Sequence, residues 1–237
     1  GKLRGHRRGD AAKVRVIPNF VDTDRIRPGE RDNSYRKELH ITPEQTVVLY
    51  AGNVGFSQSL DLLVESARRL HAAGRDDVVV VVNGGGAARP GIEAAAAGLP
   101  NVRFADMQPI ERLPEVLAAG DIHTVPLRRG LAKASVPSKL YSVLAAGRPV
   151  LASVDPGTEV ARTVERAGAG VAVPPDDPDR FHEALVRLVD DPEGARRMGA
   201  SGRQFIEGWA SPAAVAEQYE DLFEELVAAY RGRRGSR

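Results

Sequence analysis

The sequence predicts an α/β fold in which about six parallel strands form a doubly wound sheet with helices on both faces. Short runs rich in β-branched residues alternate with helical patterns from Thr46 onward. Residues 78–82 are five consecutive valines, as expected of a strand that is covered on both faces. With 237 residues, 42% of them hydrophobic, the chain is long enough to bury one large core.

Strands and helices are expected to alternate regularly along the chain. We expect strands at residues 46–51, 78–82, 101–104, 121–125, 149–153 and 169–173. The helices between them are expected near residues 59–73, 88–97, 111–119, 138–146 and 158–167. In the first helix, Leu60, Leu63 and Leu70 fall on one face. Such βα repeats predict right-handed crossovers, and we take the common strand order 3-2-1-4-5-6.

Segments outside the βα repeat indicate a piece of a larger protein. Residues 14–17 are typical of a strand that has no earlier partner, and the chain begins without a methionine. We therefore expect residues 1–24 to be the remnant of an interdomain segment, 25–210 the sheet domain, and 211–237 a last helix with a basic tail. The later helices are expected near residues 177–190, 192–207 and 212–231, and the last should pack across the outside of the domain or onto a missing one.

Composition excludes several classes of function. The net charge of +1 gives no strong field that would attract nucleic acid. The absence of cysteine excludes disulfides, a thiol nucleophile and a thiolate metal site. No apolar run approaches the roughly 20 residues that span a bilayer, and no secretory signal is visible, so we expect a cytoplasmic location. The basic ends are either solvated termini or a peripheral contact with the anionic inner face of a membrane. They comprise Lys2, Arg4, Arg7, Arg8, Arg231, Arg233, Arg234 and Arg237.

The expected strand order places a ligand between the first and fourth strands. Ligands of doubly wound sheets bind beyond the carboxyl ends of the strands, where the strand order reverses. The loops at that point are residues 52–57 and 126–137, and each leads into a helix N-terminus that suits a phosphate. Lys139 can add positive charge, as can Arg128, Arg129 and Lys133 before it. The alternative is an ordinary pair of βα connections with helix caps at Ser59 and Ser138.

Three further patterns point away from other chemistries. Residues 84–86 are three glycines, but they follow the second strand, so we interpret them as a tight turn that lets backbone approach the cleft. Asp22 and Asp24 mimic a D-x-D metal site in a turn outside the sheet, and we expect no metal there. His123 lies within an apolar strand and is expected to be a core residue rather than a base.

Several short segments, taken in order, resemble the motifs of one enzyme family. Residues 16–24 (VIPNFVDTD) resemble a hinge motif, residues 47–70 a first strand, glycine loop and helix, and residues 82–86 (VNGGG) a glycine turn. Residues 101–104 (NVRF) and 119–122 (AGDI) match shorter motifs, and residues 136–150 match "x-P-x-K-x-x-E-A-M-A-x-G-x-P-V". The chain thus resembles the retaining GT-B glycosyltransferases of the group 1, or GT4, family over nearly its whole length. Residues 52–60 and the "PSKL" segment further resemble a fucosaminyltransferase-like subgroup of bacterial polysaccharide synthesis.

This resemblance implies that residues 25–210 are a Rossmann-like domain that binds a nucleoside-diphosphate sugar, with a UDP-sugar favoured. The acceptor would be bound by an amino-terminal domain, and neither a metal nor another cofactor is implied. The residues implied to meet the donor sugar and diphosphate are Gly52, Asn53, Val54, Gly55, Arg128, Lys133, Val136, Pro137, Ser138, Lys139 and Leu140. Those implied to meet the nucleoside are Asp106, Met107, Gln108 and Ser142. No residue is assigned a catalytic role.

The sequence also departs from the family pattern. The two carboxylates of the usual E-x7-E motif correspond to Ala134 and Ser142. The basic pair of the first glycine loop corresponds to Asn53 and Gln58. Three interpretations therefore stay open. The first is the donor domain of a glycosyltransferase that builds a polysaccharide or glycoconjugate, inactive as a fragment, and the second is a non-catalytic nucleotide-sugar-binding module. The third is another GT-B enzyme, such as a nucleotide-sugar epimerase, or a dehydrogenase-like Rossmann protein, against which the absent dinucleotide fingerprint counts.

Overall fold

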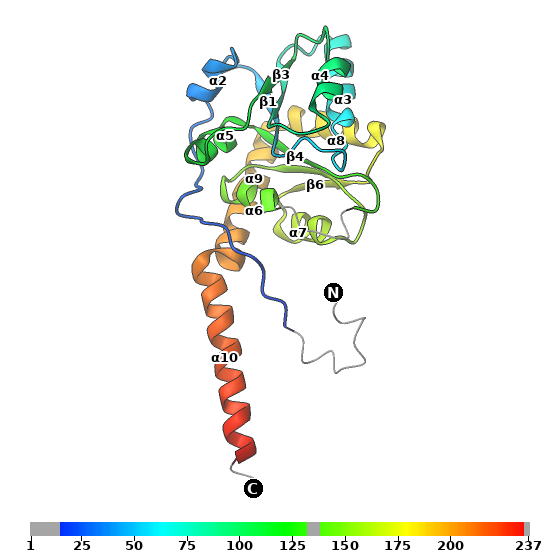
Figure 1. Cartoon of the computed structure of the whole chain (residues 1–237). Helices are drawn as coiled ribbons and strands as arrows, with labels where there is room; N and C mark the ends of the chain where they lie inside the picture. The colour runs from blue at the N-terminus through cyan, green and yellow to red at the C-terminus, as the bar shows by residue number, and fades with distance from the viewer. Residues whose placement is uncertain (1–14, 132–137, 235–237) are drawn as a thin grey trace.

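The computed structural model describes residues 15–131 and 138–234, and its centre is one parallel sheet (Figure 1). The six strands are β1 (Thr46–Ala51), β2 (Val78–Asn83), β3 (Val102–Ala105), β4 (Ile122–Pro126), β5 (Val150–Ser153) and β6 (Gly170–Val173). Their order is β3-β2-β1-β4-β5-β6, and each neighbouring pair is parallel. The predicted fold class and strand order are confirmed.

The helices follow the strands as expected, with ends shifted by a few residues. The βα units contain α3 (Asp61–Ala72), α4 (Arg89–Ala95), α5 (Leu113–Ala119), α6 (Ser138–Ala145) and α7 (Glu159–Ala167). A short 3₁₀ turn, η2 (Ile110–Arg112), precedes α5. The chain then forms α8 (Pro178–Asp190), α9 (Pro192–Ala210) and α10 (Pro212–Arg234). The helix predicted to end near residue 207 continues to Ala210, where its apolar residues still pack against the core.

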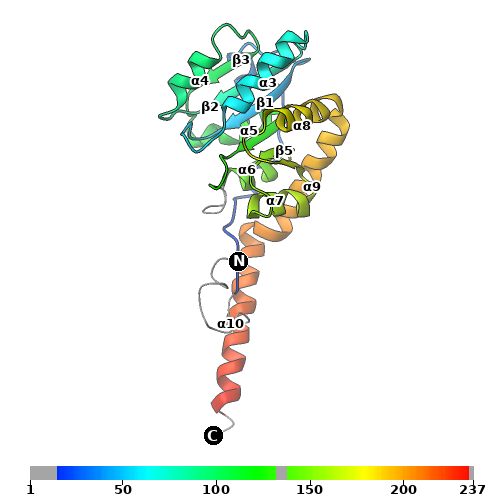
Figure 2. The same cartoon turned by 90° about the vertical axis from the view of Figure 1, so that its right-hand side faces the viewer.

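Both faces of the sheet are buried, which explains the continuous apolar strands. Val48 and Tyr50 of β1 pack in a core with residues of α3 and α8, whereas Val47 and Leu49 face a second core with residues of α5. A third core joins β4 and β5 to α6, α7 and α9. Figure 2 shows helices on both sides of the sheet. The two faces keep the strand ends in fixed positions, and those ends form the site described below.

The segment before β1 differs from the prediction. The strand predicted at residues 14–17 is wrong where it can be judged: residues 15–17 have no regular structure, and residue 14 lies outside the described part. A short helix, α2 (Ser34–Glu38), is present instead. Its fully buried Arg36 donates hydrogen bonds to the carbonyl oxygens of Gln45 and Ala119 and to the carboxylate of Asp121. These bonds hold the segment against the sheet.

The last helix does not pack across the outside of the domain, so that part of the prediction is wrong. Figures 1 and 2 show α10 projecting away from the sheet, with its first turns against α9. Its large exposed apolar side chains are Tyr219, Phe223, Leu226, Val227 and Tyr230. The described start of the chain lies alongside it, and Arg15 forms an ion pair with Glu225 at 2.6 Å. The alternative expectation, packing onto a further domain, stays a prediction.

Candidate functional site

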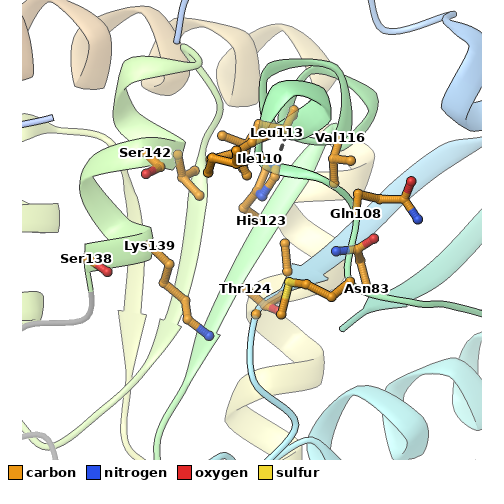
Figure 3. Close-up of a pocket in the computed structure, with 15 residues that line it drawn as sticks. Asn83, Gln108, Ile110, Leu113, Val116, His123, Thr124, Ser138, Lys139 and Ser142 are labelled. Atoms are coloured by element: carbon orange, nitrogen blue, oxygen red, sulfur yellow. Dashed lines mark hydrogen bonds between the residues drawn. The ribbon is translucent and has the colours of Figure 1, made fainter. Parts of the chain in front are cut away.

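A cavity of about 390 Å³ lies at the carboxyl ends of β1, β2 and β4, beside the first turn of α6 (Figure 3). This is the point between the first and fourth strands that the strand order predicted. The cavity is lined by Ala51, Gly52, Asn83, Met107, Gln108, Ile110, Leu113, Val116, Leu117, His123, Thr124, Ser138, Lys139, Ser142 and Val143. Six of the predicted site residues are therefore brought together: Gly52, Met107, Gln108, Ser138, Lys139 and Ser142.

Lys139 is the cation of this cavity. Its Nζ donates a hydrogen bond to the Tyr50 hydroxyl at 2.9 Å and lies 4.0 Å from the centre of the Tyr50 ring. No carboxylate of the described residues forms an ion pair with it, and burial lowers its pKa to about 8. Because Lys139 stands in the first turn of α6, the helix dipole also disfavours its charge. An anion entering the cavity would relieve both costs.

The glycine loop after β1 is less open than expected. The Gly52 N–H donates to a carbonyl at the end of β2 at 2.9 Å, and the Val54 N–H donates to a carbonyl of the loop after β2 at 2.8 Å. The Gly55 N–H donates to the side chain of Gln58 at 3.0 Å. These three N–H groups are therefore not free to bind a phosphate, because each already has a partner within the protein. The implied contact of the diphosphate with this loop stays a prediction. Positive charge must come from elsewhere in the site.

The three glycines after β2 form the close backbone approach that was predicted. Gly84 and Gly86 have φ angles of +140° and +152°. A Cβ at Gly84 would collide with the carbonyl of Gly52, and one at Gly86 with the carbonyl of Val54. The turn therefore lies directly on the loop after β1 because it has no side chains. The turn packs against the loop after β1 and is not among the residues that line the cavity.

Of the residues predicted to meet the nucleoside, three line the cavity and one does not. Met107 and Gln108 both line the cavity, and Ser142 lies across it from Gln108, on α6 one helical turn after Lys139 (Figure 3). Asp106 does not line the cavity: its side chain is 90% exposed and forms an ion pair with Arg89 at 2.6 Å.

The remaining donor-site predictions lie elsewhere in the structure. Arg128 forms ion pairs with Asp61 at 3.0 Å and with Asp176 at 3.5 Å, so the diphosphate role implied for it is not supported by its position. The side chains of Val54 and Leu140 are completely buried in the core, so only their backbone can meet a ligand. The side chain of Asn53 does not line the cavity. Lys133, Ala134, Val136 and Pro137 lie outside the described residues.

The helix cap proposed at Ser59 is wrong. The residue that caps α3 is Leu60, which makes no side-chain capping bond. The Ser59 hydroxyl instead donates to the carboxylate of Asp176 at 2.5 Å. Ser138 is the first described residue of α6, and the residues before it lie outside the described part, so the cap proposed there stays a prediction.

His123 is a core residue, as predicted, although one side of it reaches the cavity. It is 1% exposed, and its Nε2 donates to the carbonyl oxygen of Leu117 at 2.9 Å, which leaves Nδ1 as an acceptor. Burial lowers its pKa to about 4, so the imidazole is neutral at physiological pH. It can contribute a wall and an acceptor, but not a positive charge.

Sequence reasoning missed two features of the site. Asn83 ends β2 and is 4% exposed; the Tyr35 hydroxyl donates to its Oδ1 at 2.8 Å, which turns its Nδ2 donor toward the cavity. An apolar wall comes from η2, α5 and α6. It consists of Ile110, Leu113, Val116, Leu117 and Val143. Asn83 could have been found, because it is the one polar residue of an otherwise all-valine strand. Nothing in the sequence indicated the apolar wall.

Within residues 15–131 and 138–234, no group of three or more metal-ligating side chains comes together. The carboxylate of Asp22 instead accepts hydrogen bonds from the backbone N–H groups of Asp24 and Arg25, and so closes the turn. Of the described helices, none combines the length and the hydropathy that a membrane span requires.

Comparison with known proteins gives one consistent result. Residues 45–191 match the family model described as Glycosyl transferases group 1. A putative colanic acid biosynthesis glycosyl transferase, WcaI of Escherichia coli K12, is 34% identical over 215 residues, which are 88% of this chain and 51% of the relative. The chain thus spans about half the length of the curated relatives it matches.

Solved structures show the same architecture. The carboxy-terminal domain of LpcC, a group 1 family protein of Francisella tularensis, aligns with a TM-score of 0.64 at 15% identity, covering 81% of this chain and 99% of that domain. Anabaena HepE, solved in complex with UDP, aligns with a TM-score of 0.73 at 14% identity, covering 92% of this chain and 59% of HepE. The chain has the fold of the Rossmann-like carboxy-terminal half of these proteins.

Proposed function

The chain belongs to the group 1 glycosyltransferases, and from that premise we propose that its cavity binds the nucleoside diphosphate of a sugar donor. The observation that carries the proposal is the Lys139 ammonium, which lines the cavity at the strand-order reversal without a carboxylate partner among the described residues. Burial and the helix N-terminus both disfavour the charged ammonium, and an anion beside it would offset both effects. A diphosphate supplies that anion and carries negative charge as it leaves the sugar.

The rest of the cavity suits a nucleoside. An apolar wall from Ile110 to Leu117 offers a surface against which a flat base can lie, and Met107 and Gln108 border it. Ser142 lies on the same face of α6 as Lys139, so its hydroxyl can bond a ribose while the ammonium meets the phosphates. A neutral hydroxyl makes a weaker bond than the carboxylate usual at this position, so the ammonium carries more of the affinity.

UDP is the favoured nucleotide. HepE, which shares the fold, was solved with UDP, with UDP and glucose, and with UDP-glucose. Titration calorimetry of the purified chain at pH 7 with UDP, GDP and NAD tests the proposal. We expect UDP to bind more tightly than GDP, and NAD not to bind. If neither UDP nor GDP binds, the proposed function is refuted, and binding of NAD in their place would indicate a dinucleotide site.

We further propose that the donor domain acts with an amino-terminal half that binds a polysaccharide or glycoconjugate acceptor, with retention at the anomeric carbon. Support comes from the share of the relatives that the chain covers and from the apolar face of α10, on which Phe223 and Leu226 are 59% and 57% exposed. The enzyme would act in the cytoplasm, with the basic ends of the chain as the contact if it meets a membrane peripherally. The comparisons do not favour a binding module or an epimerase over a glycosyltransferase.

Activity is to be measured on the full-length protein with a UDP-sugar and a lipid-linked acceptor, by NMR of the product. A product with the anomeric configuration of the donor supports retention. Donor epimerisation without transfer would replace the proposal with the epimerase alternative, and binding without either reaction would leave a non-catalytic module. The isolated chain is expected to show no turnover.

A further inference from the structure

Tyr50 is a fully buried aromatic residue with two polar contacts beside the cavity. Its hydroxyl accepts a hydrogen bond from Lys139 Nζ at 2.9 Å and donates one to the carbonyl oxygen of Asn53 at 2.5 Å. The ammonium also lies 4.0 Å from the centre of its ring. Tyr50 therefore connects α6 with the loop after β1, the two segments that face each other across the strand-order reversal.

The phenol holds the ammonium without neutralising it. Burial raises the pKa of Tyr50, so the group stays uncharged at physiological pH. A carboxylate at this place would pair with the ammonium and compete with an incoming phosphate. A neutral hydroxyl and the negative face of an aromatic ring attract the cation more weakly and leave its charge available.

The space around the ammonium is equally restricted. Gly52 lies beside it, and a Cβ at that position would stand 2.9 Å from Lys139 Nζ. Lys139 and His123 are the only residues with a basic side chain among those lining the cavity, and His123 is neutral. The orientation of the ammonium thus depends on Tyr50 rather than on another charged group of the lining.

We propose that Tyr50 is a positioning residue for the diphosphate: its hydroxyl fixes the Lys139 ammonium against the loop after β1, so that the phosphates meet a cation already in place. This inference rests on the proposed function of the cavity, because it presumes that a diphosphate binds there. It adds the residue that orients the binding group, and Tyr50 itself need not touch the ligand.

The test compares Tyr50→Phe with Tyr141→Phe. The first variant keeps the ring and removes the hydroxyl that contacts Lys139. The second removes a hydroxyl from the same helix as Lys139, where Tyr141 is 6% exposed and packs edge-on against Trp209. UDP affinity is measured by calorimetry, and the pKa of Lys139 is measured in the ligand-free protein by NMR of lysine labelled at Cε, with Lys139→Met for assignment.

For Tyr50→Phe we expect roughly five- to twentyfold weaker UDP binding and a lower Lys139 pKa, because a hydrogen bond that favours the charged amine is lost. Tyr141→Phe is expected to match the wild type in both. If the wild type binds UDP and Tyr50→Phe retains both its affinity and its Lys139 pKa, the inference is wrong and the proposed function stands. Weaker binding with an unchanged Lys139 pKa also overturns the inference, since it indicates a structural effect. A wild type that binds neither UDP nor GDP refutes the proposed function and the inference with it.

Discussion

The affinity for UDP should fall as the pH rises from 7 to 9, because binding requires the charged form of Lys139. Burial lowers the pKa of Lys139 in the empty cavity to about 8 from its ordinary 10.5, and a bound diphosphate should restore it toward the ordinary value. The lysine is then mostly charged at pH 7 but mostly neutral at pH 9 in the free protein. With these two values, linkage gives roughly tenfold weaker binding at pH 9 than at pH 7.

The assay is calorimetry at pH 7, 8 and 9 in pairs of buffers with different ionisation enthalpies. We expect the uptake of close to one proton per UDP at pH 9, and of little at pH 7. The second ionisation of a phosphate lies near pH 6, so the ligand keeps its charge over this range. His123, with a pKa of about 4, does not titrate in it. Constant affinity from pH 7 to pH 9, without proton uptake, would refute the reasoning.

Three substitutions extend this test. Lys139→Met keeps the apolar stem and removes the charge. It should weaken UDP binding roughly 10- to 150-fold, which corresponds to about 1.5–3 kcal/mol for a charge-assisted hydrogen bond. Calorimetry should show no such loss for the control Lys37→Met, because Lys37 is exposed. Gly52→Ala should lower both UDP affinity and the melting temperature, because the position has a φ of +142° and the new methyl group would displace the ammonium; wild-type values for both would contradict this. Asp121→Ala should lower the free energy of unfolding by about 3–5 kcal/mol, because it leaves the buried Arg36 guanidinium without its carboxylate. Glu38→Ala removes an exposed ion pair and should cost about 0–1 kcal/mol. Urea unfolding measures both, and equal losses would contradict the argument.

Strand order and the place of the cavity could be predicted because both follow from local patterns. The valines of β2 and the helical period after β1 define the repeat, and the repeat defines the sheet. Lys139 lies in the first turn of the helix that follows the fourth strand, and this position places it at the strand-order reversal. These steps need only the order of the elements, and the chain preserves that order.

Features that depend on distant contacts could not be predicted. The strand expected at residues 14–17 failed because a β-rich segment needs a partner strand, and none lies beside residues 15–17. The glycine loop was expected to offer N–H groups, but the side chain of Gln58 and neighbouring carbonyls already accept from them. Tyr50 was interpreted only as part of a strand, since its contact with Lys139 joins residues 89 positions apart. The ion pairs of Arg128 could not be predicted for the same reason, because its partners Asp61 and Asp176 are distant from it in the sequence.

The described chain enters and leaves the sheet domain at one place. The Val21 N–H donates to the carbonyl of Ala210 at 3.0 Å, and Arg15 stays beside Glu225 farther along α10. A further domain attached through residues 15–21 and α10 would be connected at a hinge and not across a broad interface. Bending of the backbone near that junction would leave the register of the paired strands unchanged, and with it the positions of Gly52 after β1 and of Lys139 on α6.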